Sequence, residues 1–257
     1  MCAVAALLDS RTALGSLRRT LPRGLGAVYD CRTTGVLDRV LRSRLLDAVV
    51  LGTRAHRQID LLRLKRQFPR LPIVVYGTIK SEEGGTLLEA CERTGVAALV
   101  VEGVDDPVAG DIVARHGLTA RRAAELADLP RLLHLTEPLQ RAAFDLLRTS
   151  FGRPPPTATI ARRLRVSREH LSRQFGAGGA PNLKRVIDLL QVLAAREMLA
   201  NPGYRADAVA SLLGYSTASH LRLISRRVIG LSLTECQRAS LQELLRRFVV
   251  ARGRSRE

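Results

Sequence analysis

The sequence has no tryptophan and only nine aromatic residues among its 257, so few rings are present on which the bases of a single strand could stack. Cysteine is scarce too: the four cysteines, at positions 2, 31, 91 and 236, lie far apart and form no C-x-x-C pair. This spacing predicts neither a zinc site nor a disulfide framework, and it fits a reducing cytoplasm. We expect Cys31 and Cys91 to be small buried hydrophobic residues.

Long apolar runs and catalytic motifs are also missing. The apolar opening segment, residues 1–8, is too short for a signal peptide or a membrane span and is expected to form a buried strand. The sequence contains no Gly-rich phosphate loop, nucleophile motif or cofactor fingerprint, and its five histidines show no metal-binding spacing. We therefore expect no catalytic, cofactor-binding or metal site, no enzymatic activity and no membrane association.

Positive charge is what the sequence has in excess. Lys and Arg number 41 against 24 Asp and Glu, a formal net charge of +17. Residues 1–134 hold 20 basic and 15 acidic residues, whereas residues 135–257 hold 21 and 9. An Arg-rich genome would raise the charge everywhere, but this asymmetry favours a C-terminal half that attracts a polyanion such as nucleic acid.

The first part of the chain alternates short apolar segments with amphipathic ones. The apolar segments are residues 3–8, 27–29, 48–51, 73–76 and 97–101, and the amphipathic ones are residues 11–20, 33–43, 57–68 and 82–94. This pattern predicts an α/β domain over residues 1–117 with a five-stranded parallel sheet of flavodoxin-like order, covered by helices on both faces. A helical connector is expected over residues 118–156, with a helix over 139–151 that the Gly and Pro residues at 152–156 end.

The C-terminal half contains two copies of one sequence pattern. Residues 159–175 and 209–227 each read as a short helix, a tight turn and a second helix. Ala161 and Ala210 provide small side chains where the helices cross, and Ser167 and Ser216 stand where an N-cap is needed. Apolar residues at helical spacing point inward in both copies, namely Leu171, Phe175, Leu221 and Ile224.

The opposite faces of the two second helices are polar and basic. Paired helix-turn-helix units with such faces are built to enter the major grooves of double-stranded DNA. The predicted DNA-binding residues are Arg168, Glu169, Ser172, Arg173, Thr217, Ala218, Ser219, Arg222 and Arg226. A long helix over residues 183–200, about 27 Å at 1.5 Å per residue, is expected to hold the two units roughly one DNA turn apart.

Residues 157–238 resemble the AraC/XylS family of bacterial transcription regulators. The resemblance is carried by Ile160, Ala161, Ser167, His170, Leu171, Ser172, Arg173, Phe175, Ala195, Met198, Leu199, Val209, Ala210, Leu213, Gly214, Tyr215, Ser216, Ser219, His220, Leu221 and Gly230. It implies a tandem helix-turn-helix domain over residues 157–240, followed at 241–257 by a helix and a basic tail. It also implies base contacts from Glu169, Ser172 and Arg173 and from Ala218, Ser219 and Arg222.

The second unit departs from the family pattern at three positions. Leu223 stands where the family usually has arginine, Ser225 where it has an aromatic residue and Leu233 where it has proline. In the first unit, the segment at residues 176–179 is shorter and more flexible than usual, and Gln191 replaces a common arginine. These departures predict a weaker second unit with a looser core under its recognition helix.

The first domain is similar to a response-regulator receiver, over residues 47–52, 71–75 and 95–101. Phosphoryl transfer to a receiver needs an acceptor carboxylate, acidic metal ligands and a lysine. Here Gly52 occupies the acceptor position, Gly77 the hydroxyl position and Glu102 the lysine position. The resemblance therefore implies a domain that is not phosphorylated at the usual site and serves docking or dimerisation.

These observations predict a sequence-specific transcription regulator that binds double-stranded DNA and is associated with the nucleoid in the cytoplasm. A second copy of the chain, through the N-terminal domain, and RNA polymerase are the other expected partners. A non-specific architectural DNA-binding protein is the alternative, because the C-terminal charge alone would bind DNA. A small-molecule sensor or enzyme at the strand ends of the first domain is a third possibility that rests on fold analogy alone.

Overall fold

The computed structural model of the chain describes residues 3–22, 27–79, 81–150 and 152–250. The chain divides into two compact units. Unit 1 comprises residues 1–121 together with 201–204, and unit 2 comprises residues 122–200 and 205–257.

Unit 1 is built on a five-stranded sheet whose paired strands all run parallel. The strands are β1 (Ala3–Leu7), β2 (Val28–Asp30), β3 (Leu46–Leu51), β4 (Ile73–Gly77) and β5 (Ala98–Val101). Their order is β2-β1-β3-β4-β5. This is the flavodoxin-like order, so the predicted fold of the first part is confirmed. The central strands are buried along their whole length, which explains why they read as continuous apolar runs.

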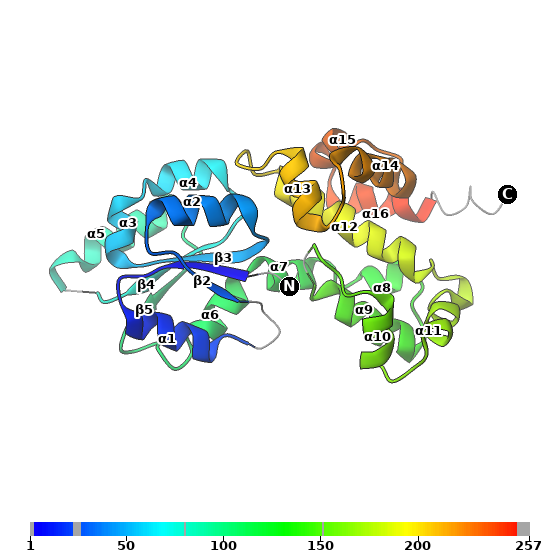
Figure 1. Cartoon of the computed structure of the whole chain (residues 1–257), viewed down its shortest axis with the longest axis horizontal. Helices are drawn as coiled ribbons and strands as arrows, with labels where there is room; N and C mark the ends of the chain where they lie inside the picture. Colours follow the sequence, from blue (N-terminus) through cyan, green and yellow to red (C-terminus); the bar gives the residue numbers. More distant parts are fainter. Residues whose placement is uncertain (1–2, 23–26, 80, 151, 251–257) are drawn as a thin grey trace. The chain divides into compact units, whose positions relative to one another are not determined.

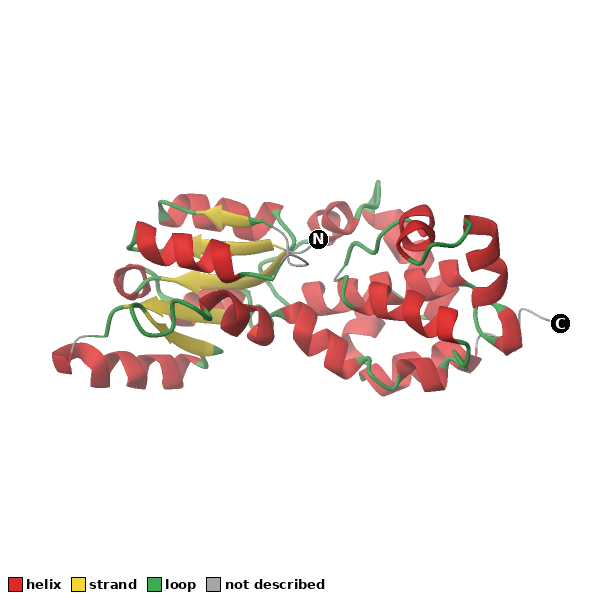
Figure 2. Ribbon diagram, turned by 90° about the horizontal axis from the view of Figure 1, so that it is seen from below, coloured by secondary structure: helices red, strands yellow, loops and turns green. Residues whose placement is uncertain are grey.

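Helices cover both faces of this sheet (Figures 1 and 2). They are α1 (Arg11–Thr20), α2 (Thr34–Ser43), α3 (Thr53–Gln58), α4 (Leu61–Gln67), α5 (Ser81–Thr94) and α6 (Ala109–His116), with α7 (Leu118–Glu125) running on into unit 2. Side chains of α1 and α6 pack on alternate strand residues such as Val50 and Val74. Helices α2, α3 and α4 lie on the opposite side.

The prediction of a single helix over residues 57–68 was wrong. The chain forms α3 and α4 there, with Ile59 in an extended conformation between them. Asp60 is the N-cap of α4, and its Oδ1 accepts a hydrogen bond of 2.9 Å from the Arg63 N–H. An aspartate that caps a new helix competes with continuation of the old one, which the apolar spacing alone did not reveal.

Small residues and short polar side chains shape the carboxyl end of the sheet. A Cβ atom at Gly52, directly after β3, would lie 2.5 Å from Asp9 Oδ2. Asp9 Oδ2 in turn accepts a hydrogen bond of 2.8 Å from the Arg54 N–H at the start of α3. A Cβ at Gly77 would lie 2.9 Å from the Thr53 side chain.

Cys31 and Cys91 are buried as expected, and burial and the neighbouring Asp30 raise the pKa of Cys31 to about 11.

Unit 2 is all-helical, which also agrees with the sequence. Its helices are α8 (Leu129–Leu132), α9 (Pro138–Arg148), α10 (Thr157–Arg163), α11 (Arg168–Phe175), α12 (Leu183–Leu199), α13 (Ala206–Leu213), α14 (Ala218–Ile229), α15 (Leu233–Arg238) and α16 (Leu241–Val250), with a short 3-10 turn at Ala177–Gly179. The helix expected over 139–151 ends earlier, at Arg148, and residue 151 lies outside the described residues.

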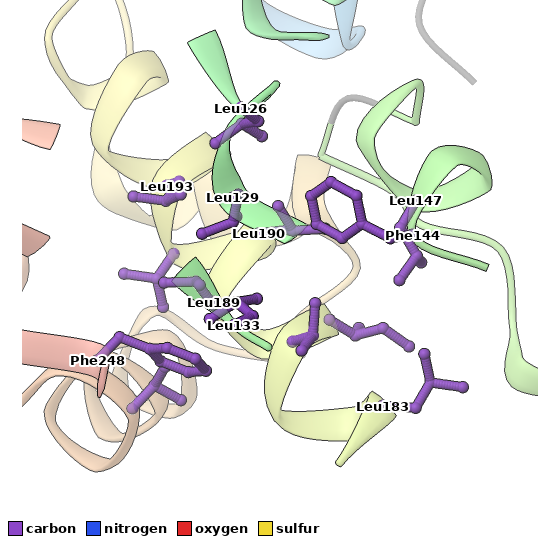
Figure 3. Close-up of a cluster of buried hydrophobic side chains, with 14 of the residues drawn as sticks. Leu126, Leu129, Leu133, Phe144, Leu147, Leu183, Leu189, Leu190, Leu193 and Phe248 are labelled. Atoms are coloured by element: carbon purple, nitrogen blue, oxygen red, sulfur yellow. The ribbon is translucent and has the colours of Figure 1, made fainter. Parts of the chain in front are cut away.

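Helix α12 is the centre of unit 2. Eleven of its 17 residues are buried, and the cluster around it includes Phe144 of α9, Phe175 of α11 and Phe248 of α16. Figure 3 shows Leu189, Leu190 and Leu193 of α12 beside leucines of the segment that contains α8. Because other helices bury α12 on most sides, its position is fixed by packing. It therefore forms the central support of unit 2.

Candidate DNA-binding interface

The first helix-turn-helix pair consists of α10 and α11. Ala161 of α10 is buried where the helices meet, and Leu171 and Phe175 of α11 are fully buried. Ser167 is the N-cap of α11, as predicted: its Oγ accepts a hydrogen bond of 3.1 Å from the His170 N–H. Arg165, in the turn before it, has a φ of +56°, a left-handed conformation that costs a non-glycine residue energy.

The second pair, α13 and α14, has the same arrangement. Ala210 is buried at the crossing, and Leu221 and Ile224 are buried beneath α14. The left-handed residue of this turn is Gly214, with a φ of +87°. The predicted N-cap, Ser216, is wrong by one residue, because Thr217 Oγ1 accepts the 3.1 Å hydrogen bond from the His220 N–H.

A second correction concerns Ala218, which was predicted to face DNA. It is 3% exposed, because it begins α14 three residues before the buried Leu221 and so shares the inward face of the helix. The Thr217 side chain is exposed but its oxygen is engaged in capping. The remaining predicted residues, namely Arg168, Glu169, Ser172, Arg173, Ser219, Arg222 and Arg226, are all exposed.

The outward faces of α11 and α14 are basic, and several of their arginines have no partner among the described residues. Among the residues that the structure describes, no hydrogen bond or ion pair engages the guanidinium groups of Arg168, Arg173 or Arg222. The face of α14 continues with Arg226 towards the C-terminal end of the helix. The His220 side chain packs instead against the turn between α13 and α14. Its ring is edge-on to the Tyr215 ring, with 5.3 Å between the two centroids. Two N-capped helices thus present cationic side chains that are available for a partner.

Polar side chains of neighbouring helices fix each pair in place, and the sequence did not single them out for this role. Gln140 of α9 is buried, and its Nε2 donates to the carbonyl oxygens of Gln174, Phe175 and Ala177 at 3.0–3.2 Å. These carbonyls lie at the end of α11 and in the short 3-10 turn that follows it. A glutamine on the apolar face of α9 was the only signal for this contact.

Gln191 of α12 anchors the second pair in a similar way. Its Nε2 donates to the Leu213 carbonyl at 3.3 Å, and its Oε1 accepts from the Tyr215 hydroxyl at 3.0 Å. Burial raises the pKa of Tyr215 above its ordinary value, and the negative charge of Asp188 raises it further. The glutamine that replaces the family's arginine therefore joins α12 to the turn of the second pair.

The expectation of a looser core under α14 is not met at Ser225. This residue is buried, and its Oγ donates to the Leu231 carbonyl at 2.9 Å and lies 3.4 Å from Cys236 Sγ. Ser232 and Glu235 then form a capping box at α15, and the hydrogen bonds from Ser232 lower the pKa of Glu235. Hydrogen bonds of the Ser225 hydroxyl thus stabilise the position at which the family usually has an aromatic residue.

A cavity of about 700 Å³ opens between the two pairs. Its lining combines α11 (Arg168, Ser172), the start of α12 and the end of α14 (Arg227, Val228). Asp188 of α12 is 2% exposed, and its two carboxylate oxygens pair with Lys184 and with Arg227, the latter at 2.9 Å. One buried carboxylate therefore orients two exposed cations at the mouth of this cavity.

Comparison with known proteins agrees with this geometry. Residues 160–239, which contain both helix pairs, match a family model described as "Helix-turn-helix domain". These residues form a helix-turn-helix domain of the AraC type. The chain therefore contains a DNA-binding helix-turn-helix domain. No curated protein matches the sequence.

Two solved structures are similar to this chain over most of its length. Full-length FixJ from B. japonicum is 16% identical with a TM-score of 0.37, covering 83% of this chain and 97% of its own. The RcsB response regulator from Salmonella typhimurium is 18% identical with a TM-score of 0.37, covering 74% of this chain and 99% of its own. The fold of each unit follows from its own strand order and helix packing, as described above.

Metal sites and membrane spans are both absent from the residues that the structure describes. No group of three or more His, Cys, Asp or Glu side chains is arranged to hold a metal ion there. Nor does any described helix have the length and apolar character needed to cross a membrane.

Proposed function

We propose that the protein is a sequence-specific regulator that places α11 and α14 in two adjacent major grooves of one DNA duplex. The observation that carries this proposal is the pair of N-capped helices, each with an exposed arginine that has no partner in the described chain, Arg173 on α11 and Arg222 on α14. Helix α14 packs on α12, whose 17 residues span about 25 Å at 1.5 Å per residue, and α11 joins the same core through Phe175. Successive major grooves on one side of DNA are about 34 Å apart, a distance that two helices packed on such a rod can bridge.

The exposed residues divide by chemistry into base readers and phosphate contacts. Arg173 is suited to a bidentate contact with guanine, and Glu169 and Ser172 share its face of α11. Ser219 and Arg222 take the corresponding part on α14, while Ala218 is excluded by its burial. The proposed contacts with backbone phosphates are Arg168, Arg226 and the pair of Lys184 and Arg227 that Asp188 orients, while Thr217 is the cap.

The first unit acts, in this proposal, as a receiver-like module that works without phosphorylation at the usual site. Gly52 has no side chain to accept a phosphoryl group, and the Asp9 carboxylate occupies the adjoining space. The unit nevertheless keeps its full sheet and core. We propose that it serves docking or homodimerisation, with RNA polymerase as a further partner of the regulator. Sedimentation of the full-length chain without DNA as a monomer at micromolar concentration would count against the dimer.

Non-specific coating of DNA is the alternative, and selection of bound duplexes from a random pool separates the two. Affinity for the selected duplex and for a random duplex is then measured across a salt series. A regulator binds the selected duplex at least a thousandfold more tightly, whereas a coating protein shows a ratio near one.

Variants at Arg173 assign the contact. Arg173→Ala should cost about 1–3 kcal/mol on the selected duplex, and the loss should disappear when the base pair it reads is changed. Arg39→Ala, which removes one exposed arginine of α2, is the matched control for net charge. An equal loss for Arg173→Ala on every duplex would move Arg173 to a phosphate contact.

A further inference from the structure

Leu223 is the one large hydrophobic side chain that α14 exposes, as far as the structure describes the helix. Its side chain is 63% exposed, although Ile224 beside it is buried. Single exposed leucines are common on protein surfaces, so exposure alone decides nothing. The position does: Leu223 lies on the outward face, one turn after Ser219 and between Arg222 and Arg226.

Counting from the N-caps puts α11 and α14 in register. Ser167 and Thr217 each cap the third residue that follows, and Leu171 and Leu221, four residues after each cap, are both fully buried. Six residues after the caps stand Arg173 in α11 and Leu223 in α14, both exposed. Leu223 therefore takes in the second pair the place that Arg173 takes in the first.

The side chains of Arg173 and Leu223 favour contacts with different bases. An arginine pairs with the O6 and N7 acceptors of guanine, whereas a leucine can make no hydrogen bond at all. The C5-methyl group of thymine is the apolar group that an unmodified base offers in the major groove. A leucine pressed on any other base edge would strip water from donors or acceptors without replacing it.

We propose that Leu223 is a specificity determinant that packs on the methyl group of one thymine in the half-site bound by α14. This inference rests on the proposed function and adds to it the kind of base that α14 selects. Arg222 and Arg226 flank the leucine and supply the electrostatic attraction that an apolar contact lacks. The second pair is thus not a weakened copy of the first, but one that reads a methyl group in place of a guanine.

Deoxyuridine tests this directly, because it has the hydrogen-bonding groups of thymine without the methyl. Each thymine of the selected duplex is replaced singly by deoxyuridine, and the Kd of the full-length protein is measured. We expect one position in the α14 half-site where the replacement weakens binding about 3- to 10-fold, the scale of one buried methyl group. In Leu223→Ala the affinity for the thymine duplex falls by a similar factor, and the difference between thymine and deoxyuridine at that position disappears.

Two further variants complete the experiment. Leu62→Ala truncates a leucine of α4 that is 48% exposed and should leave the thymine preference unchanged. Leu223→Arg should move the preference at that position from thymine towards guanine. If no thymine shows the methyl effect, or if the effect persists in Leu223→Ala, the assignment of Leu223 is wrong while the two-groove proposal stands. If no duplex is selected from the pool at all, the proposed function fails and this inference fails with it.

Discussion

The carboxylate of Asp9 fills the space into which a side chain at position 52 would project, since a Cβ on Gly52 would lie 2.5 Å from Asp9 Oδ2 and 2.9 Å from the Asp9 backbone nitrogen. The same oxygen caps the start of α3 through the Arg54 N–H. Position 52 is where the receiver resemblance locates the phosphoryl acceptor. The glycine is therefore part of a packed arrangement and is not simply a missing carboxylate.

This packing predicts that Gly52→Ala destabilises the protein by about 1–3 kcal/mol, through overpacking and loss of the Asp9 cap. In the Asp9→Ala background the same substitution should cost less, because the carboxylate that the new methyl meets is gone and only the contact with the backbone nitrogen of residue 9 remains. Urea unfolding of the four proteins in this double-mutant cycle measures the coupling. Additive effects of the two substitutions would contradict the account of position 52, and Gly35→Ala, where a Cβ meets nothing within 4 Å, is the control.

The sequence predicted the order of the α/β unit well because a buried parallel sheet leaves continuous apolar runs at every strand. Boundaries were less predictable where two capping residues adjoin: Ser216 and Thr217 both suit an N-cap, and only the backbone conformation decides for Thr217. The one-residue error carried over to Ala218, which was assigned to the outward face and lies on the inward one.

The contacts that Asp188 and Gln140 make with other helices could not be predicted from the sequence, for a different reason. Asp188 and Gln140 are polar residues within apolar helix faces, and their partners come from other helices. A local pattern can show that such a residue is unusual, but not which carbonyl or cation it meets after folding. The departures at Gln191 and Ser225 likewise suggested loss of packing, whereas hydrogen bonds to Tyr215 and Leu231 replace it.

Two tyrosines, the buried Tyr76 and the half-buried Tyr215, predict loss of stability at high pH. Burial and Asp106, which accepts the Tyr76 hydroxyl at 2.6 Å, raise the pKa of Tyr76, and burial and Asp188 raise that of Tyr215. In the unfolded chain both phenols ionise near about pH 10, so the unfolded state loses protons first. Stability from these groups is complete below that pH and falls as the pH rises towards the folded pKa values.

Titration of phenolate absorbance measures this effect. Two tyrosines of the native protein should ionise later than they do in denaturant, and Tyr76→Phe and Tyr215→Phe should each remove one of them. Each variant should also flatten the decline of the urea midpoint above about pH 10. A native titration curve identical to the denatured one would rule out the shifts.

The turns of the two helix pairs predict opposite effects of glycine. Arg165 holds a φ of +56° with a side chain, so Arg165→Gly should stabilise the protein by up to about 1 kcal/mol once the gain in unfolded-chain entropy is subtracted. Gly214 holds a φ of +87° and a Cβ there meets nothing within 4 Å, so Gly214→Ala should destabilise by about 1–2 kcal/mol from backbone strain alone. Urea midpoints of the two variants test this pair, and a destabilising Arg165→Gly would show that the arginine side chain outweighs its strain.

The N-caps give a matched test of how the recognition helices begin. Ser167→Ala and Thr217→Ala each remove the oxygen that accepts the N–H of His170 or His220, and each should destabilise the protein by about 1 kcal/mol. Ser216→Ala is the control: this serine is exposed and precedes the cap, so its removal should change stability by less than about 0.5 kcal/mol. Because frayed helix ends hold Arg173 and Arg222 less firmly, the two cap variants should also bind the selected duplex more weakly, by a few-fold. A larger loss for Ser216→Ala than for Thr217→Ala would mean that Ser216 is the cap and that α14 begins one residue earlier.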